Sequence, residues 1–199
     1  MGVPSAYGGD PGPPGSGLMM QCGLAEGIGK NLPFAQLYAN HMAALQTVVL
    51  YGSKMQKDIV CIDGVSGFLT VFGERTEIYS KNGFITGSSF IKAANLAEVK
   101  NFLIQVEFEE ETRFVLLPKN CSGITIHEKT DEWGTVLVEF SEVELENDAI
   151  LPDVSEAGDK ITNFEIQDWL EDTFTLLSSA SVLGTQISSS PPSVLFTAF

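Results

Sequence analysis

Few side chains in this sequence could carry nucleophilic or metal chemistry. The 199 residues include two histidines and three cysteines, namely His41, His127, Cys22, Cys61 and Cys121. The histidines lie far apart, the cysteines have no C-x-x-C spacing and no G-x-S-x-G turn occurs, so neither a zinc site nor a nucleophile–histidine pair is indicated. We expect both histidines to be ordinary surface or boundary residues, with His127 facing solvent.

Charge and composition argue against several classes of partner. The chain has 26 acidic and 11 basic residues, a formal net charge of −15, and no cluster of Lys and Arg. Nucleic acid and anionic membrane surfaces both need such a basic cluster, so we expect neither as a partner. The longest apolar stretch, Met42 to Tyr51, is about half the length of a membrane span, and none is expected. Widely spaced cysteines in an odd number favour a soluble, reducing compartment such as the cytoplasm.

Two helices are expected near the N-terminus. Between Asn31 and Tyr51, apolar residues recur at steps of three and four and a glycine follows, which is typical of a helix and its end. Ser53 and Gln56 have the spacing of a capping box, in which each side chain pairs with a backbone N–H of the first turn. A second, short helix is therefore predicted from Ser53 to about Val60.

From Cys61 onward the apolar period changes from 3.6 residues to 2, which indicates strands. In residues 104–108 and 124–128, branched and aromatic residues alternate with polar ones, as in a sheet with one face in water. Turn residues separate the segments, so an antiparallel meander is expected. The predicted strands are residues 67–71, 77–79, 83–91, 104–108, 114–117, 124–128, 135–140 and 143–145.

One more amphipathic helix is expected near the C-terminus. Thr162 and Glu165 have a second capping-box spacing, and apolar residues from Ile166 to Val182 make a wide stripe. Residues 187–199 are expected to form a poorly ordered tail. The predicted fold class is α+β, with N-terminal helices in residues 1–60, a central antiparallel β-sandwich or barrel in residues 61–157, and the single C-terminal helix and tail in residues 158–199.

Five segments of the chain, in order, resemble motifs of the acyl-CoA dehydrogenase family. Each falls on the type of element predicted above, and together they span roughly residues 1–185. The segments are residues 2–9 (GVPSAYGG), 50–57 (LYGSKMQK), 69–77 (LTVFGERTE), 114–126 (FVLLPKNCSGITI) and 138–151 (VEFSEVELENDAIL). The chain is thus similar to a divergent and truncated slice of that family, covering its N-terminal and middle domains.

The resemblance implies a partial helical N-terminal domain, a β middle domain and the start of a C-terminal helical bundle. In the family, FAD lies between the β-domain and the bundle and accepts a hydride from an acyl thioester, on CoA or a carrier protein, while a glutamate removes a proton. By position in the matched motifs, Thr76 is implied to bind substrate. The residues implied to contact FAD are Leu69, Thr70, Ile91, Lys92 and Ala93.

The match departs from the family at this implied cofactor site. Ile91 and Ala93 stand where the family has an aromatic ring and a hydroxyl, and the catalytic base is not identified. An amphipathic helix without partner helices also leaves apolar area in water, so a homo- or hetero-oligomer formed through the C-terminal helix is expected. Two hypotheses follow: a FAD-dependent acyl-CoA dehydrogenase-like oxidoreductase that works within an oligomer, or a non-catalytic binding or assembly protein that keeps the scaffold but has lost flavin and base.

Overall fold

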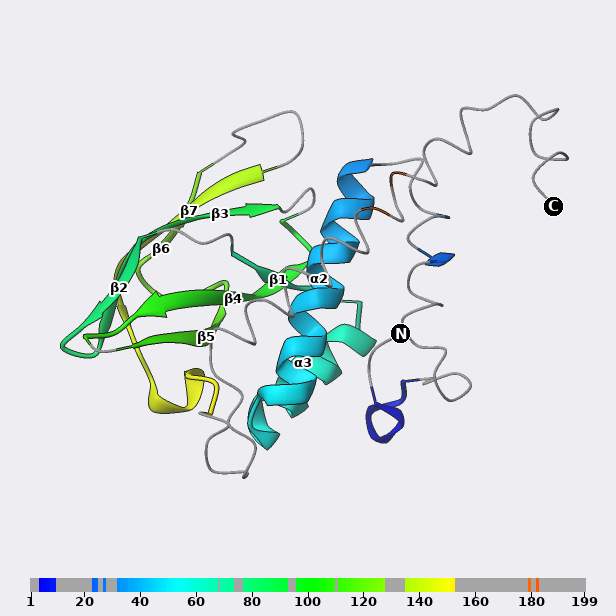
Figure 1. The fold of residues 1–199 in the computed structure, drawn as a ribbon, viewed down its shortest axis with the longest axis horizontal. Coiled ribbons are helices and arrows are strands. Elements are labelled where there is room, and N and C mark those ends of the chain that lie inside the picture. The colour runs from blue at the N-terminus through cyan, green and yellow to red at the C-terminus, as the bar shows by residue number, and fades with distance from the viewer. Residues whose placement is uncertain are drawn as a thin grey trace, which may run out of the picture.

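Two helices pack along one side of a curled β-sheet in the computed structural model of the chain (Figure 1). The structure describes residues 4–9, 23–24, 27, 32–67, 69–73, 77–92, 96–109, 111–127, 135–152, 179 and 182. The predicted C-terminal helix and tail lie outside these residues, apart from Ser179 and Val182. The elements are η1 (Ser5–Tyr7), α2 (Leu32–Tyr51), α3 (Lys54–Val65), β1 (Leu69–Phe72), β2 (Ile78–Lys81), β3 (Phe84–Lys92), β4 (Val99–Glu107), β5 (Thr112–Pro118), β6 (Ile124–Ile126), β7 (Thr135–Glu144) and η2 (Asn147–Ala149).

The two predicted helices meet at a sharp corner at Gly52. A Cβ at this glycine would lie 2.6 Å from the carbonyl oxygen of Val48, so a side chain there would force the corner open. The predicted capping box is confirmed, because the Gln56 N–H donates to Ser53 Oγ and the Ser53 N–H donates to Gln56 Oε1, at 3.2 and 2.8 Å. Helix α3 continues beyond its expected end near Val60. Within the described residues, neither helix has the length and apolarity that a bilayer crossing requires.

The described strands form one curled sheet of mixed direction. Successive hydrogen-bonded pairs follow the order β1–β4–β2–β3–β7–β6, and β5, off this path, also pairs with β4. The pairs β2–β3, β3–β7, β4–β5 and β6–β7 are antiparallel, as expected, but β1 and β2 both run parallel to β4. The expectation of an antiparallel sheet thus holds for most pairs and is wrong for β1–β4 and β2–β4. The alternating pattern predicts a strand but carries no information about which strand it joins or in which direction.

The β2–β3 hairpin explains how the chain reverses. Asn82 and Gly83 form its two-residue turn, and both have positive φ, at 54° and 79°. An Asn-Gly pair adopts this left-handed backbone at low cost, and its twist matches that of the flanking strands. β3 consequently returns antiparallel to β2 and then pairs with β7 along most of its length.

Two apolar cores hold the helices and the sheet together. The inner core fills the curl of the sheet and comprises Leu37, Val71, Ile78, Ile85, Ile91, Val99, Phe102, Ile104, Val106, Val115, Leu117, Val136, Val138, Phe140 and Val143. The helix–sheet core joins α2 and α3 to β4 and β5 and comprises Met42, Ala43, Ala44, Leu45, Val48, Val60, Cys61, Leu103, Phe114, Leu116 and Leu151. Apolar burial of this kind contributes about 25 cal/mol per Å².

The two cores correct the expectation that β4 has one face in water. Residues 101–106 are all buried, because α2 and α3 cover the face that carries Leu103 while the opposite face lines the curl. Gln105 is also buried, so its polar side chain does not mark a face of β4 in water. For β6 the expectation holds, since Thr125 is exposed between the half-buried Ile124 and Ile126.

Candidate functional site

β1 carries the first two residues implied to contact a cofactor, Leu69 and Thr70. Val71 lies in the inner core, so alternation along the strand turns Thr70 and Phe72 toward α2. Thr70 is only 1% exposed, and its Oγ1 accepts a long hydrogen bond of 3.4 Å from Asn101 Nδ2. The Thr70 hydroxyl therefore faces the protein interior and is hydrogen-bonded there. The neighbouring Leu69 is only half-buried and is the more accessible of the two.

Asn101 extends this contact into a polar cluster between β4 and α3. Its Nδ2 also donates to Asp63 Oδ2 at 3.1 Å, and Lys100 Nζ donates to Asp63 Oδ1 at 2.8 Å. The lysine is half-exposed and the carboxylate is mostly buried, so the ion pair is partly shielded from solvent. The cluster thus links the C-terminal half of α3 to the strand beside Thr70.

The outer edge of β1 is closed by two side chains of α2. Asn40 Nδ2 donates to the Phe72 carbonyl oxygen at 2.9 Å, and Asn40 Oδ1 accepts from the Phe72 N–H. His41 Nδ1 lies 3.0 Å from the carbonyl oxygen of Thr70 and 3.1 Å from its amide nitrogen. His41 is only 8% exposed, so the expectation of a surface or boundary histidine is wrong for it.

Burial sets the protonation of His41. Desolvation lowers the pKa of the imidazole below its ordinary value, and the hydrogen bond to the Thr70 carbonyl opposes this only in part. The ring is therefore neutral at neutral pH. In the neutral ring Nδ1 either donates to the Thr70 carbonyl or accepts from the Thr70 N–H, depending on the tautomer.

His127 directly follows β6, at the other end of the strand order from β1, and contacts a surface carboxylate. Its Nε2 is 2.8 Å from Glu139 Oε2, and both side chains are nearly half exposed, which confirms the prediction that His127 faces solvent. In the part of the chain that the structure describes, no three His, Cys, Asp or Glu side chains gather where they could hold a metal ion. The two histidines thus contact the main chain of Thr70 and the Glu139 carboxylate, respectively.

β3 carries the next implied cofactor residue, Ile91. Ile91 is fully buried in the inner core, whereas the preceding Phe90 is 43% exposed. Side chains alternate across a strand, so the exposed aromatic plane at this end of β3 belongs to Phe90. Motif matching missed Phe90, because the adjacent apolar residues Phe90 and Ile91 do not indicate which of the two faces out; the burial of Ser89 and Ile91 in the structure shows it. The Lys92 side chain, Ala93 and Thr76 lie outside the described residues.

The structure brings the ends of β1 and β3 together. An antiparallel bridge joins Gly73, at the end of β1, to Ile91. A Cβ on Gly73 would lie 2.6 Å from Ser89 Oγ and 3.1 Å from Ile104 Cγ2, so glycine permits this close approach. Segments about 20 residues apart in sequence, both implied to contact a flavin, therefore meet at one place on the sheet.

An isoalloxazine ring needs a flat apolar surface and hydrogen-bonding groups along its edge. Phe90 satisfies the first requirement, because its ring is exposed beside the Gly73–Ile91 bridge. The Thr70 hydroxyl does not satisfy the second, because it is buried and faces Asn101. The described residues therefore fit a flavin through the aromatic plane of Phe90, and not through the Thr70 or Ile91 side chains.

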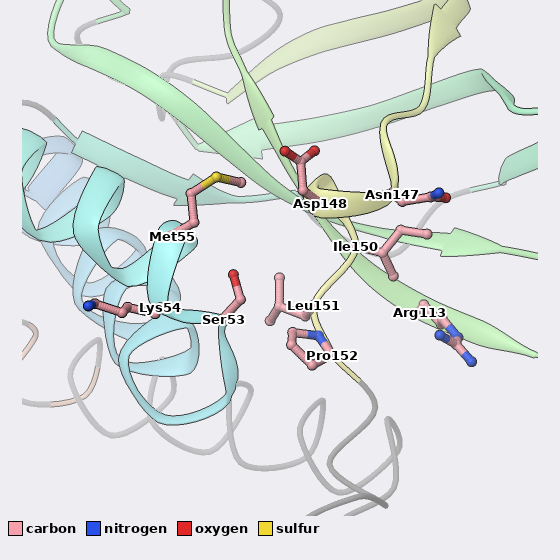
Figure 2. Close-up of a pocket in the computed structure, with 9 residues that line it drawn as sticks. All are labelled: Ser53, Lys54, Met55, Arg113, Asn147, Asp148, Ile150, Leu151 and Pro152. Atoms are coloured by element: carbon pink, nitrogen blue, oxygen red, sulfur yellow. The ribbon is translucent and has the colours of Figure 1, made fainter.

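A separate open groove of about 650 Å³ lies where α3 begins and the chain leaves β7. Figure 2 shows Met55, Leu151 and Pro152 along it, with the charged tips of Lys54 and Arg113 turned away from Leu151 on opposite sides. Arg113 Nε instead donates to Glu111 Oε1 at 2.7 Å. The groove is lined by apolar residues together with the polar or charged Ser53, Lys54, Arg113, Asn147 and Asp148, so its surface is of mixed character.

Comparison with known proteins supports the fold and not a specific activity. No protein-family model and no curated protein matches the sequence. Among solved structures, the ChsE4–ChsE5 complex from Mycobacterium tuberculosis matches with a TM-score of 0.70 at 18% identity. An FAD-dependent dehydrogenase matches with 0.71 at 15%, and a glutaryl-CoA dehydrogenase from Mycobacterium smegmatis in complex with FADH2 with 0.64 at 16%.

These matches cover most of this chain and about half of each solved one. They span 92%, 94% and 85% of the chain but only 49%, 60% and 46% of the three solved structures, in the same order. Identities below 20% show shared architecture alone. The chain therefore has the fold of roughly half of an acyl-CoA dehydrogenase or related FAD-dependent dehydrogenase.

Proposed function

We propose that this chain belongs to an acyl-CoA dehydrogenase-like flavoprotein, which binds FAD where β1 and β3 meet and oxidises the CH–CH bond of an acyl thioester as part of an oligomer. The observation that carries the proposal is the bridge between Gly73 and Ile91, with the exposed ring of Phe90 beside it. This bridge joins the two segments that resemble flavin-contacting motifs, on a scaffold shared with FAD-dependent dehydrogenases.

Each residue of the proposed site has a limited role. Phe90 would supply the flat surface against the isoalloxazine, and the half-buried Leu69 would lie at its edge. Thr70, whose main chain pairs with His41, would hold β1 beside the ring. Ile91 fills the core beneath them, while Lys92, Ala93 and Thr76 are proposed to lie nearby, Thr76 on the substrate side. When bound, the flavin supplies the electron sink for removing two hydrogens beside a thioester on CoA or a carrier protein. No catalytic base is assigned.

The proposed assembly is a homo- or hetero-oligomer formed through the predicted C-terminal helix. Similar solved proteins include a two-component complex and an electron-transferring flavoprotein, which makes association a reasonable extension to this chain. The proposed compartment is soluble and reducing, such as the cytoplasm. Within the described residues, Cys61 and Cys121 both have free thiols, as a reducing compartment would maintain.

Flavin binding tests the proposal directly. Purified protein should take up FAD, with a flavin absorbance spectrum perturbed from that of free FAD. Phe90→Ala should weaken the affinity about two- to tenfold, because an aromatic stacking contact contributes about 0.5–1.5 kcal/mol. Phe84→Ala is the matched control, since Phe84 is similarly exposed at the opposite end of the same strand. A folded, colourless protein that takes up no added FAD would contradict the proposal.

The non-catalytic alternative is favoured by one specific observation. Thr70, the implied hydroxyl donor, is buried and faces Asn101, so a flavin would lack that contact. A scaffold that had lost its cofactor would keep the sheet and its ability to associate without binding FAD. Mass measurement of the colourless protein in solution would then show an oligomer that carries no flavin.

A further inference from the structure

β1 is an edge strand whose outer edge is buried rather than wet. Its inner edge faces β4, since the Leu69 N–H donates to the Glu98 carbonyl at 2.8 Å and the Gly73 N–H donates to the Leu103 carbonyl at 2.9 Å. The N–H and C=O groups of the intervening Thr70 and Phe72 therefore point the opposite way, toward α2. Buried backbone groups need hydrogen-bond partners, and here a helix covers the place of a neighbouring strand.

Asn40 replaces that missing strand at Phe72. A carboxamide is chemically equivalent to a peptide group, with one acceptor and N–H donors in a plane. Asn40 uses both, donating to the Phe72 carbonyl and accepting from its N–H, as a paired strand residue would. The amide nitrogen and carbonyl of Phe72 are thus held by one rigid, buried side chain.

His41 continues this edge at Thr70 with a single nitrogen. Its Nδ1 is at hydrogen-bonding distance from both backbone groups of Thr70 but pairs with one of them at a time. Beyond Phe72 the main chain takes over, because Gly73 bridges to Ile91 on β3. The orientation of β1 at the proposed flavin site is therefore set by two helix side chains followed by a strand.

We propose that Asn40 and His41 are positioning residues for flavin binding. Together they occupy the place of a neighbouring strand along the outer edge of β1, hold β1 against β3 and so fix the surface beside Phe90. This inference rests on the function proposed above. Neither side chain needs to touch the flavin. Loosening β1 would weaken the Gly73–Ile91 bridge and let β1 move away from the aromatic plane of Phe90.

Amide hydrogen exchange and FAD titration of the full chain test this role together. Asn40→Ala should raise the exchange rate of the Phe72 amide about tenfold or more, relative to Val138 on β7, and should weaken FAD binding by a similar factor. Asn40→Asp covers the case in which the alanine variant fails to fold. It keeps the acceptor for the Phe72 N–H but cannot donate to the carbonyl, so Phe72 should stay protected while FAD affinity falls.

Thr47→Val is the matched control on the same helix. Thr47 is buried and its Oγ1 donates to the Ala43 carbonyl at 2.9 Å, within α2 and away from β1. A purely structural role for Asn40 predicts that Asn40→Ala and Thr47→Val behave alike at equal stability. Our inference predicts that only the Asn40 variants change Phe72 exchange or FAD affinity.

The outcomes separate this inference from the proposed function. His41→Asn, which keeps a polar atom near the Nδ1 position, should restore most of the FAD affinity that His41→Ala loses. Wild-type protein without FAD affinity would overturn the proposed function and with it the role of both residues. Wild-type protein that binds FAD, together with an Asn40→Ala variant that binds it equally well, would overturn this inference alone.

Discussion

Replacing Gln56 with glutamate should loosen the contact between the start of α3 and the chain that leaves β7. The Gln56 side chain is 2% exposed, and its Nε2 donates to the carbonyl oxygens of Asp148 and Ile150 at 2.8 and 3.1 Å. Its Oε1 accepts from the Ser53 N–H. A glutamate has nearly the same shape and keeps that acceptor, but its second oxygen would face two carbonyl oxygens without a proton to donate.

The expected loss follows from these groups. Each buried carbonyl that loses its donor costs about 1–3 kcal/mol, and a buried unpaired carboxylate adds to the loss, so the free energy of unfolding should fall by about 3–5 kcal/mol at neutral pH. Burial and the facing carbonyls raise the pKa of the introduced carboxyl. Once protonated, it can donate one hydrogen bond, so the loss relative to wild type should shrink as the pH falls through that raised pKa.

Urea unfolding at neutral and at mildly acidic pH measures both effects. Ser53→Ala is the matched control, because it removes only the hydroxyl that accepts from the Gln56 N–H and should cost about 1 kcal/mol. Gln56→Glu should be clearly worse than this control at neutral pH and closer to it in acid. If the two variants unfold alike, or if the loss does not depend on pH, the assigned hydrogen bonds of Gln56 do not hold this end of the sheet.

Three further predictions concern the sheet and its edge. Gly87→Ala should lower the free energy of unfolding in urea by more than about 3 kcal/mol, since Gly87 has φ +141° and a Cβ there would collide with backbone. Gly83→Ala is the control, because a Cβ there meets open space, and it should cost about 1–2 kcal/mol. Equal losses in the two variants would contradict this prediction. The lowered pKa of His41 predicts a pH dependence of stability. Between the ordinary pKa of histidine and the lowered pKa of His41, only the unfolded state binds the proton, so the free energy of unfolding should fall as the pH drops through this window. His41→Asn should remove this slope. Phe114→Ala should cost about 3–5 kcal/mol, and a loss under about 1 kcal/mol would show that the helix–sheet core is not closed around this ring.

Local features of the chain could be predicted because they depend on neighbours in sequence. The capping box of Ser53 and Gln56 was predicted and is confirmed, since both partners lie within one turn. Helix α2 ends at Tyr51 as expected, because a glycine must follow at the tight corner. Exposure of His127 follows from alternation along a short strand with one wet face.

Other features depend on partners far along the chain. Parallel pairing of β1 and β2 with β4 is absent from any local pattern, because the side-chain alternation of a strand is the same in either direction. Burial of His41 was missed for a related reason. A polar residue on a helix reads as exposed until a strand edge with unpaired backbone groups is placed beside it.

At the candidate site, the sequence by itself singled out two segments through a family resemblance, and the tertiary structure decided which of their side chains are exposed. Motif resemblance picked out Leu69, Thr70 and Ile91 from the order and spacing of residues. Folding then turned Thr70 toward α2 and Ile91 into the inner core, and it left Phe90 as the exposed ring. Sequence spacing specifies the strand, but only packing on both faces of the sheet determines which side of that strand a ligand could reach.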